Sequence, residues 1–518
     1  MSWAGRLALG GAWALQAALM PMAAAAGGPP ASAGVETVVA APAARAPAPC
    51  WLRGWSQAAR CGVLLRPLDP ARPQGVLIEV HYAVLPALAR HKADDAVFFF
   101  AGGPGQSAID LAATLASRFN RLNQRRDLVF VDQRGTGRSA PLKCADDDER
   151  AVLQPLAERA DVRQRLPRLQ ACRQALQALP HGNLRFYTTE LAMADVDAVR
   201  QALGITRLNA IGASYGTRAV LSYQRQFPQA VRRAVLDGVA PPDMRLPETA
   251  ALDNQAALDA LLQACAGEPA CARRHPDLPA QLGALLASLP QDVALPHPVS
   301  GRIETVTLQR DTVLSLLRTP LYAPSLAAAL PAAIAEAAAG RWAPLVALAS
   351  ALGGSGGGLA TGMHFSVVCA EDLGPNAPAL NPADAAATQA PGQTFGASFA
   401  ELYRQVCADW PRGTVSPAFY TLPPASAPTW LLSGGLDPVT PPRHGARVAQ
   451  ALGPLARHIV VPNAGHGVLS LGCMRDAAQR FIAADDDAAL TTPADCAAAL
   501  PRPIAFVPPG GAAPGPAK

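Results

Sequence analysis

Charged residues, and lysine above all, are scarce in this sequence of 518 residues. Only 16% of the residues are charged, the formal net charge is +5, and the only lysines are Lys92, Lys143 and Lys518. No long block of consecutive basic residues occurs, so the electrostatic footprint of a nucleic-acid-binding protein is missing. We therefore expect no nucleic-acid partner.

Motifs for binding metals and phosphate are also absent. The ten cysteines contain no C-x-x-C spacing, and no histidine-rich segment accompanies them, which argues against a zinc site. The glycine-rich segment 102–105 lacks both the lysine followed by serine or threonine and the G-x-G-x-x-G spacing of phosphate-binding loops. We expect no metal and no cofactor.

Long apolar runs are missing everywhere except at the N-terminus. There an apolar stretch from Leu7 to about Met22 follows the positive charge of Arg6, and small residues come next, which is typical of an export signal. An uncleaved membrane anchor is the alternative, because the stretch is about long enough to span a bilayer. We expect a signal peptide within residues 1–33, an Ala/Pro-rich linker over 34–49, and a periplasmic or secreted protein without membrane contact after cleavage.

The cysteines agree with the predicted periplasmic or secreted location. Their number is even, and disulfides persist in oxidising compartments. Counting alone leaves the connectivity open. The cysteines nevertheless fall into couples that are close in sequence, which suggests the pairs Cys50 with Cys61, Cys144 with Cys172, Cys265 with Cys271, Cys369 with Cys407, and Cys473 with Cys496.

Short apolar runs alternate with helical patterns between residues 50 and 241. The patterns predict helices over 190–203 and 217–227, with Asp195 and Asp197 toward the exposed side of the first. Runs that are apolar throughout suit strands buried on both faces of a parallel sheet. The alternation predicts an α/β fold with a doubly wound, mostly parallel sheet. The expected strands are 75–84, 96–101, 127–131, 208–211 and 233–239.

The pattern changes after residue 241. Ala/Leu-rich helices separated by proline and glycine, with few strand-like runs, predict a helical lid inserted over 242–428. Strands over 429–433 and 458–461, with a helix over 441–452 between them, resume the core, which extends over 429–500. The last segment, 501–518, is rich in proline, glycine and alanine and is expected to be disordered.

A G-x-S-x-G pattern occurs twice, around Ser214 and around Ser355. Ser214 stands between a predicted strand and a predicted helix, the strand, sharp turn and helix setting of a nucleophile elbow. Ser355 lies in a run of glycines with no strand before it, which is typical of a flexible linker. We therefore expect Ser214 to be the nucleophile.

A serine nucleophile needs a general base, and that base needs a carboxylate to orient it. The strand over 429–433 runs into Asp437, and the strand over 458–461 runs into His466, which has a glycine on each side. Nucleophile, acid and base follow one another in the chain order that this kind of elbow requires. The sequence thus predicts the catalytic triad Ser214, Asp437 and His466.

Acyl transfer also needs N–H donors for the oxyanion, each contributing about 3 to 4 kcal/mol. The amide of Tyr215, directly after the nucleophile at a helix N-terminus, is one candidate. The other should come from the glycine-rich turn after the strand over 96–101, and we expect Gly103, with Gly102 as second choice.

Several segments together resemble one known family, the secreted α/β-hydrolase peptidases of the proline iminopeptidase and tripeptidyl aminopeptidase type. The segments are 102–105, 131–139, 212–217, 236–239 and 437–441, which read GGPG, VDQRGTGRS, GASYGT, LDGV and DPVTP. Cys61 and Gly62, ahead of the residues 67–69, look like the entry strand of the tripeptidyl branch. This sequence departs from the family at Ala101, where the family often has histidine. Because the expected oxyanion donors of this loop are backbone amides, we expect activity to survive this difference.

The resemblance implies an α/β-hydrolase fold and a serine aminopeptidase acting on short peptides, with no cofactor. In such relatives lid carboxylates bind the free α-ammonium of the substrate, and Glu371 and Asp372, which follow Cys369, are the candidates here. An esterase that uses the same triad on small acyl esters is the alternative, and a non-catalytic binding protein of the same fold is a remote one.

Three further residues of these motifs have simple structural interpretations. Asp132 and Arg134 are predicted to form a buried pair that braces the loop beside the nucleophile. Thr440, followed by Pro441, has the signature of a helix N-cap with proline at the first helical position.

Overall fold

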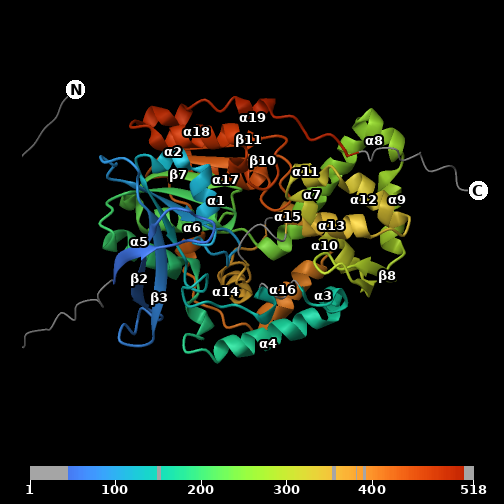
Figure 1. The fold of residues 1–518 in the computed structure, drawn as a ribbon, viewed down its shortest axis with the longest axis horizontal. Coiled ribbons are helices and arrows are strands. Elements are labelled where there is room, and N and C mark those ends of the chain that lie inside the picture. Colours follow the sequence, from blue (N-terminus) through green and yellow to red (C-terminus); the bar gives the residue numbers. More distant parts are fainter. Residues whose placement is uncertain (1–44, 149–152, 353–357, 381, 389–392, 507–518) are drawn as a thin grey trace, which may run out of the picture. The chain divides into compact units, whose positions relative to one another are not determined.

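A nine-stranded sheet organises the described part of the chain (Figure 1). The structure is a computed structural model that describes residues 45–148, 153–352, 358–380, 382–388 and 393–506. The predicted signal peptide, most of the linker, Ser355 and the end of the C-terminal segment lie outside the described residues. The strands in spatial order are β1 (Arg45–Cys50), β2 (Ala59–Pro67), β3 (Leu77–Leu85), β5 (Asp127–Val131), β4 (Ala96–Phe100), β6 (Leu208–Ala213), β7 (Val231–Asp237), β10 (Thr429–Gly434) and β11 (Ala456–Val461).

The sheet is parallel from β5 to β11 and antiparallel at its β1–β3 end. All five residues of β4 are buried, and they alternate between two apolar cores. Val97 and Phe99 belong to one core, while Phe98 and Phe100 belong to the other, so helices cover both faces. The predicted doubly wound, mostly parallel α/β sheet is confirmed.

Most helices outside the segment between β7 and β10 pack against the sheet, but Leu156–Ala160 and Arg165–Gln177 pack against the segment between β7 and β10. Residues of α1, α2 and α18 contribute to one core, and residues of α5, α6 and α17 to the other. These helices are α1 (Ala112–Arg118), α2 (Asn120–Asn123), α3 (Leu156–Ala160), α4 (Arg165–Gln177), α5 (Thr189–Ala202), α6 (Tyr215–Gln226), α17 (Pro442–Leu452), α18 (Gly472–Ala483) and α19 (Cys496–Ala499).

The chain between β7 and β10 forms a mostly helical insertion with an apolar core of its own (Figure 1). Its helices are α7 (Leu246–Gly267), α8 (Pro269–Arg274), α9 (Leu278–Ala287), α10 (Arg310–Leu321), α11 (Pro324–Ala327), α12 (Leu330–Ala338), α13 (Ala343–Ser350), α14 (Thr361–Glu371), α15 (Pro382–Thr388) and α16 (Ser398–Asp409). An antiparallel hairpin of β8 (Gln291–Pro296) and β9 (Ile303–Leu308), which the sequence analysis missed, also lies here.

Both ends of the described chain are more ordered than the sequence analysis expected. Strand β1 lies within the segment predicted as a linker and pairs with β2. At the other end, the amide of Phe506 donates to the carbonyl of Ala328, and Arg502 donates to the carbonyl of Ala260. These two hydrogen bonds hold residues 502 and 506 against the insertion, although a composition rich in proline suggested disorder.

Two carboxylates of α5 that were expected to be exposed are buried. Asp195 accepts hydrogen bonds from Arg134 at 2.7 and 3.0 Å and from Arg66 at 3.0 Å. Asp197 accepts from the hydroxyl of Tyr223 at 2.7 Å. The predicted exposure was wrong because arginine and tyrosine from other elements cover this helix face.

The predicted pair of Asp132 with Arg134 is also wrong, since Arg134 binds Asp195 instead. Asp132 accepts hydrogen bonds from the Ser107 hydroxyl at 2.7 Å and from the amides of Ile109 and Arg138. Each of the two residues is buried and braces a loop, but with a different partner.

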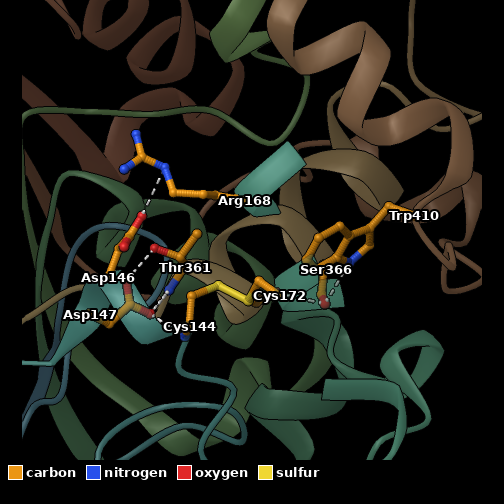
Figure 2. Close-up of a disulfide and its surroundings, with 9 residues drawn as sticks. Cys144, Asp146, Asp147, Arg168, Cys172, Thr361, Ser366 and Trp410 are labelled. Atoms are coloured by element: carbon orange, nitrogen blue, oxygen red, sulfur yellow. Dashed lines mark hydrogen bonds and ion pairs between the residues drawn. A yellow bond between two sulfur atoms is a disulfide. The ribbon is translucent and has the colours of Figure 1, made fainter. Parts of the chain in front are cut away.

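Five disulfides pair the cysteines as the sequence suggested, and no described cysteine is free. The Cys144–Cys172 bridge ties the loop after β5 to α4 (Figure 2). Beside it, Asp147 accepts hydrogen bonds from the amide of Cys144 at 2.7 Å and from the amide of Thr361 at 2.8 Å. The bridge therefore supports the start of α14.

The loop lengths closed by two of these bridges predict different effects on stability. Cys144–Cys172 spans 28 residues and Cys265–Cys271 spans 6. The loss of chain entropy in the unfolded state predicts about 3.5 kcal/mol of stabilisation for the longer loop and about 2 kcal/mol for the shorter. Replacing each pair by alanine and measuring the free energy of unfolding in denaturant should give the larger loss for Cys144 with Cys172. The reverse order would contradict this account.

Candidate active site

Ser214 occupies a sharp turn between β6 and α6. Its backbone has φ 55° and ψ −125°, a conformation that residues with a side chain rarely adopt. Its amide donates to the carbonyl of Asp237 at 2.8 Å, and its carbonyl accepts from the amide and the hydroxyl of Thr217. Strained backbone of this kind persists only where the surroundings hold it.

The two glycines around Ser214 are required by close approach. A Cβ at Gly212 would lie 2.5 Å from the carbonyl oxygen of Gly216, and a Cβ at Gly216 would lie 2.0 Å from the carbonyl oxygen of Phe100. Neither distance leaves space for a side chain. The G-x-S-x-G pattern around Ser214 thus reflects the packing of α6 against β6 and β4.

Asp437 and His466 form a hydrogen-bonded pair at the ends of β10 and β11. His466 Nδ1 lies 2.8 Å from Asp437 Oδ2, and the Asp437 side chain is buried. Burial alone would raise the pKa of Asp437, but the charge and hydrogen bond of His466 hold that pKa below its usual value. Burial alone would lower the pKa of His466, but Asp437 raises it above its usual value. The imidazole is thus oriented through its Nδ1 atom.

Thr440 contacts both members of this pair. These contacts were not predicted from the sequence. Its hydroxyl donates to Asp437 Oδ2 at 2.8 Å and lies 3.3 Å from His466 Nδ1, while its amide donates to Asp437 Oδ1. The predicted N-cap role was wrong, because α17 begins at Pro442 and its N-cap is Pro441. The threonine fixes the carboxylate rather than the helix.

A second buried carboxylate lies near the histidine. Asp237, at the end of β7, accepts hydrogen bonds from the amides of Val468 and Leu469 at 2.8 and 2.9 Å. Burial raises the pKa of Asp237 to about 6, although those amides and the charge of His466 oppose the rise. The carbonyl of Asp237 also accepts from the amide of Ser214, so Asp237 joins the turn at Ser214 to the loop that follows His466.

The insertion contributes to the position of His466. The amide of His466 donates to the carbonyl of Tyr322 at 2.9 Å, and the two rings meet edge to face at 5.3 Å between centroids. A Cβ at Gly465 would lie 2.4 Å from that same carbonyl oxygen. The histidine loop therefore packs directly on the insertion.

One cavity of about 560 Å³ contains most of the predicted site residues. Ser214 and His466 both line it, and Asp437 lies behind His466. The predicted oxyanion donors Gly103 and Tyr215 line it as well. The insertion supplies much of the remaining wall, including Met244, Leu246, Asn254, Arg318, Tyr322, His364, Val368, Asp372, Phe399 and Tyr403.

The glycine-rich loop lies against Ser214. A Cβ at Gly102 would lie 3.3 Å from the Cβ of Ser214. His364 of α14 supports this loop, since its Nδ1 lies 3.3 Å from the carbonyl oxygen of Pro104 and its Nε2 lies 2.7 Å from the Tyr403 hydroxyl. Burial lowers the pKa of His364 to about 4, so the ring is neutral and can both donate and accept.

Tyr215 begins α6, where the first N–H groups have no acceptor within the helix. Its side chain points into the protein, where its hydroxyl lies 2.7 Å from Thr189 Oγ1. The amide is thus the part of Tyr215 suited to a ligand in the cavity.

Glu371 and Asp372 are both buried and both contact Arg218. Asp372 receives two hydrogen bonds from the guanidinium, at 2.9 and 3.0 Å, and one from the amide of Leu246. Glu371 accepts from the amide and hydroxyl of Thr189 and lies outside the cavity wall. Burial raises the pKa of Glu371 to about 7, against the charge of Arg218. Of the two, only Asp372 reaches the cavity.

Parts of this chain are similar in sequence to known proteins. The tripeptidyl aminopeptidase of Streptomyces coelicolor is 34% identical over 197 residues, which cover 35% of each chain. Serine protease Hip1 of Mycobacterium tuberculosis is 31% identical over 192 residues, 36% of each chain. The alignments thus span about a third of the length of these relatives. The solved proline iminopeptidase of Mycobacterium smegmatis is 17% identical with a TM-score of 0.36, covering 81% of this chain and 97% of that one.

A family model matches over a much longer range, residues 95–472, which runs from β4 to the start of α18. This range includes the sheet from β4 to β11, the nucleophile turn, the insertion and the Asp437–His466 pair. By this match, the chain belongs to the alpha/beta hydrolase fold family.

Proposed function

We propose that this protein is a serine peptidase that releases N-terminal residues or tripeptides from short peptides. The observation that carries the proposal is the shared cavity of Ser214 and His466, with His466 Nδ1 bonded to Asp437 at 2.8 Å. The partial likeness to tripeptidyl aminopeptidase and serine protease supports a peptide substrate. The five disulfides favour a periplasmic or secreted location, because such bonds persist in oxidising compartments. Within the described ranges no helix is long and apolar enough to cross a bilayer.

The proposed reaction has two steps. His466 Nε2 removes the proton of Ser214 as Oγ attacks the substrate carbonyl, and Asp437 stabilises the imidazolium that forms. The amides of Tyr215 and Gly103 donate to the oxyanion. His466 then protonates the leaving amine, and a water molecule, activated by the same base, hydrolyses the acyl-enzyme.

The proposed exopeptidase character depends on Asp372. A carboxylate offers about four acceptor positions, and Asp372 uses three of them on Arg218 and Leu246. Because burial raises the pKa of Glu371 to about 7, Glu371, Asp372 and Arg218 together carry one excess negative charge only above that pH. A substrate ammonium in the cavity would meet both a free acceptor position and a favourable charge.

Loss of the nucleophile hydroxyl should abolish turnover. Ser214→Ala should reduce kcat by about five to six orders of magnitude, as removal of a triad nucleophile does in other serine peptidases. Peptide hydrolysis followed by chromatography measures this loss. Ser355→Ala is the matched control in the second G-x-S-x-G pattern and should retain full activity. Covalent labelling of Ser355 by an organophosphonate would contradict the assignment.

The activity should depend on the protonation of His466. Its pKa is raised above 6.5, so kcat/KM should increase as the pH rises through that raised value and the imidazole becomes neutral. Asp437→Asn removes the charge that favours the imidazolium, so the midpoint should move to lower pH while the plateau falls by about four orders of magnitude. A pH profile of kcat/KM tests both effects.

Glu336→Gln serves as the control for this profile, because it removes an exposed ion pair with Arg341 on the insertion. Glu336→Gln should change neither the midpoint nor the plateau of the pH profile of kcat/KM. An Asp437→Asn profile with an unchanged midpoint would show that Asp437 does not control the titration of His466.

The free amine of the substrate should increase the rate. A charge-assisted hydrogen bond contributes about 1.5 to 3 kcal/mol, so an N-acetylated peptide should have a kcat/KM at least about tenfold lower than the free peptide. Asp372→Asn should reduce this ratio, whereas Glu401→Gln, at an exposed position of α16, should not. Equal rates on blocked and free peptides, with faster cleavage of small acyl esters, would favour an esterase.

A further inference from the structure

A smaller chamber lies beside the active-site cavity. Its volume is about 100 Å³, and it shares Asn254, Arg318 and Phe399 with the wall of the larger cavity. The shared residues come from α7, α10 and α16 of the insertion. A substrate acylating Ser214 would therefore have part of its length close to this chamber.

Two arginines line the chamber. Arg318 projects from α10, and its guanidinium carbon lies 5.0 Å from the ring centroid of Phe399. Arg165, the first residue of α4, lies on the same wall. Burial and then the charge of Arg318 lower the pKa of the Arg165 guanidinium, which places the two cations within electrostatic reach of one another.

Within the described ranges neither guanidinium takes part in a hydrogen bond or an ion pair. Asp311 is the acidic residue of the chamber, and its Oδ1 accepts from the Ser398 hydroxyl at 2.9 Å. Two positive charges thus face one negative charge that is not bonded to them. A guanidinium offers five N–H donors in a fixed plane, an arrangement that matches a carboxylate.

Arg318 also lines the cavity that contains Ser214 and His466. It lies within electrostatic reach of Tyr322, the residue whose carbonyl accepts the amide of His466. The charge of Arg318 also acts on Tyr403, whose hydroxyl lies 2.7 Å from His364 Nε2 beside the glycine-rich loop. Arg318 therefore connects the chamber with the place where the substrate would react.

We propose that Arg318 and Arg165 form an anion subsite that binds a carboxylate of the peptide substrate. The inference rests on the proposed peptidase function and adds a substrate class to it. With an ammonium at Asp372 and a carboxylate at Arg318, both charged ends of a substrate are held by the insertion. Such a site favours short peptides over long chains.

The test compares three peptides of equal length and the same free N-terminus. One has a C-terminal carboxylate, one has a C-terminal amide, and one has the amide together with glutamate as its last residue. The free acid should show a kcat/KM about 10- to 150-fold above that of the neutral amide, the ratio expected from a charge-assisted contact. Arg318→Gln should bring this ratio close to one, and Arg165→Gln should reduce it.

Two further variants control the interpretation. Arg318→Lys keeps the charge and should keep part of the preference, which separates the loss of charge from misfolding. Arg302→Gln changes an exposed arginine of the insertion, at the turn before β9, and should retain the full ratio. Circular dichroism should show the same fold for every variant.

The outcomes show which carboxylate of the substrate is recognised. They also separate a failure of the anion subsite from a failure of the proposed peptidase function. Fast cleavage of the glutamate amide would support recognition of a side-chain carboxylate, and fast cleavage of the free acid alone would support recognition of the C-terminus. Equal rates on all three peptides, lowered equally by Arg318→Gln, would overturn the anion subsite and leave the peptidase function intact. No cleavage of any peptide, with rapid ester hydrolysis, would overturn the peptidase function itself.

Discussion

The close approach of α6 to β4 is the constraint on which the site depends. Gly216 lies against the carbonyl of Phe100, α6 begins directly beyond the end of β6, and Ser214 in the turn between them has a positive φ. This conformation costs on the order of 1–3 kcal/mol, which the buried sheet core on both faces offsets. The glycine-rich loop starts from the same end of β4, so the packing of α6 against β4 brings Ser214 close to the predicted oxyanion donors.

The histidine depends on a second set of contacts that joins the core to the insertion. Asp237 holds the loop after His466 from the sheet side, and the Tyr322 carbonyl holds the amide of His466 from the insertion side. The insertion therefore helps to hold the proposed catalytic residue His466 and also forms part of the wall of the cavity. Exchange of the insertion between relatives would have to preserve the backbone around Tyr322.

Local patterns predicted most of the fold, because strand runs, the nucleophile turn and the Asp437 and His466 loops are encoded in contiguous segments. The errors concern partners that are distant in sequence. Asp195 looked exposed because Arg134 and Arg66 cannot be placed opposite it from helical periodicity. Thr440 looked like a helix cap, and the spacing of three residues from Asp437 was the local signal that could have indicated its bond to the carboxylate. The pairing of Asp372 with Arg218 needs the three-dimensional fold.

The disulfide connectivity has a consequence for biosynthesis. Each cysteine is bonded to its nearest neighbour among the cysteines, first with second, third with fourth, and so on to the ninth with the tenth. When such a chain emerges from its N-terminus into an oxidising compartment, the correct partner of each unpaired cysteine is always the next one to arrive. Oxidation in order of emergence would then yield the native bridges directly and would leave no mispaired bonds for an isomerase to rearrange.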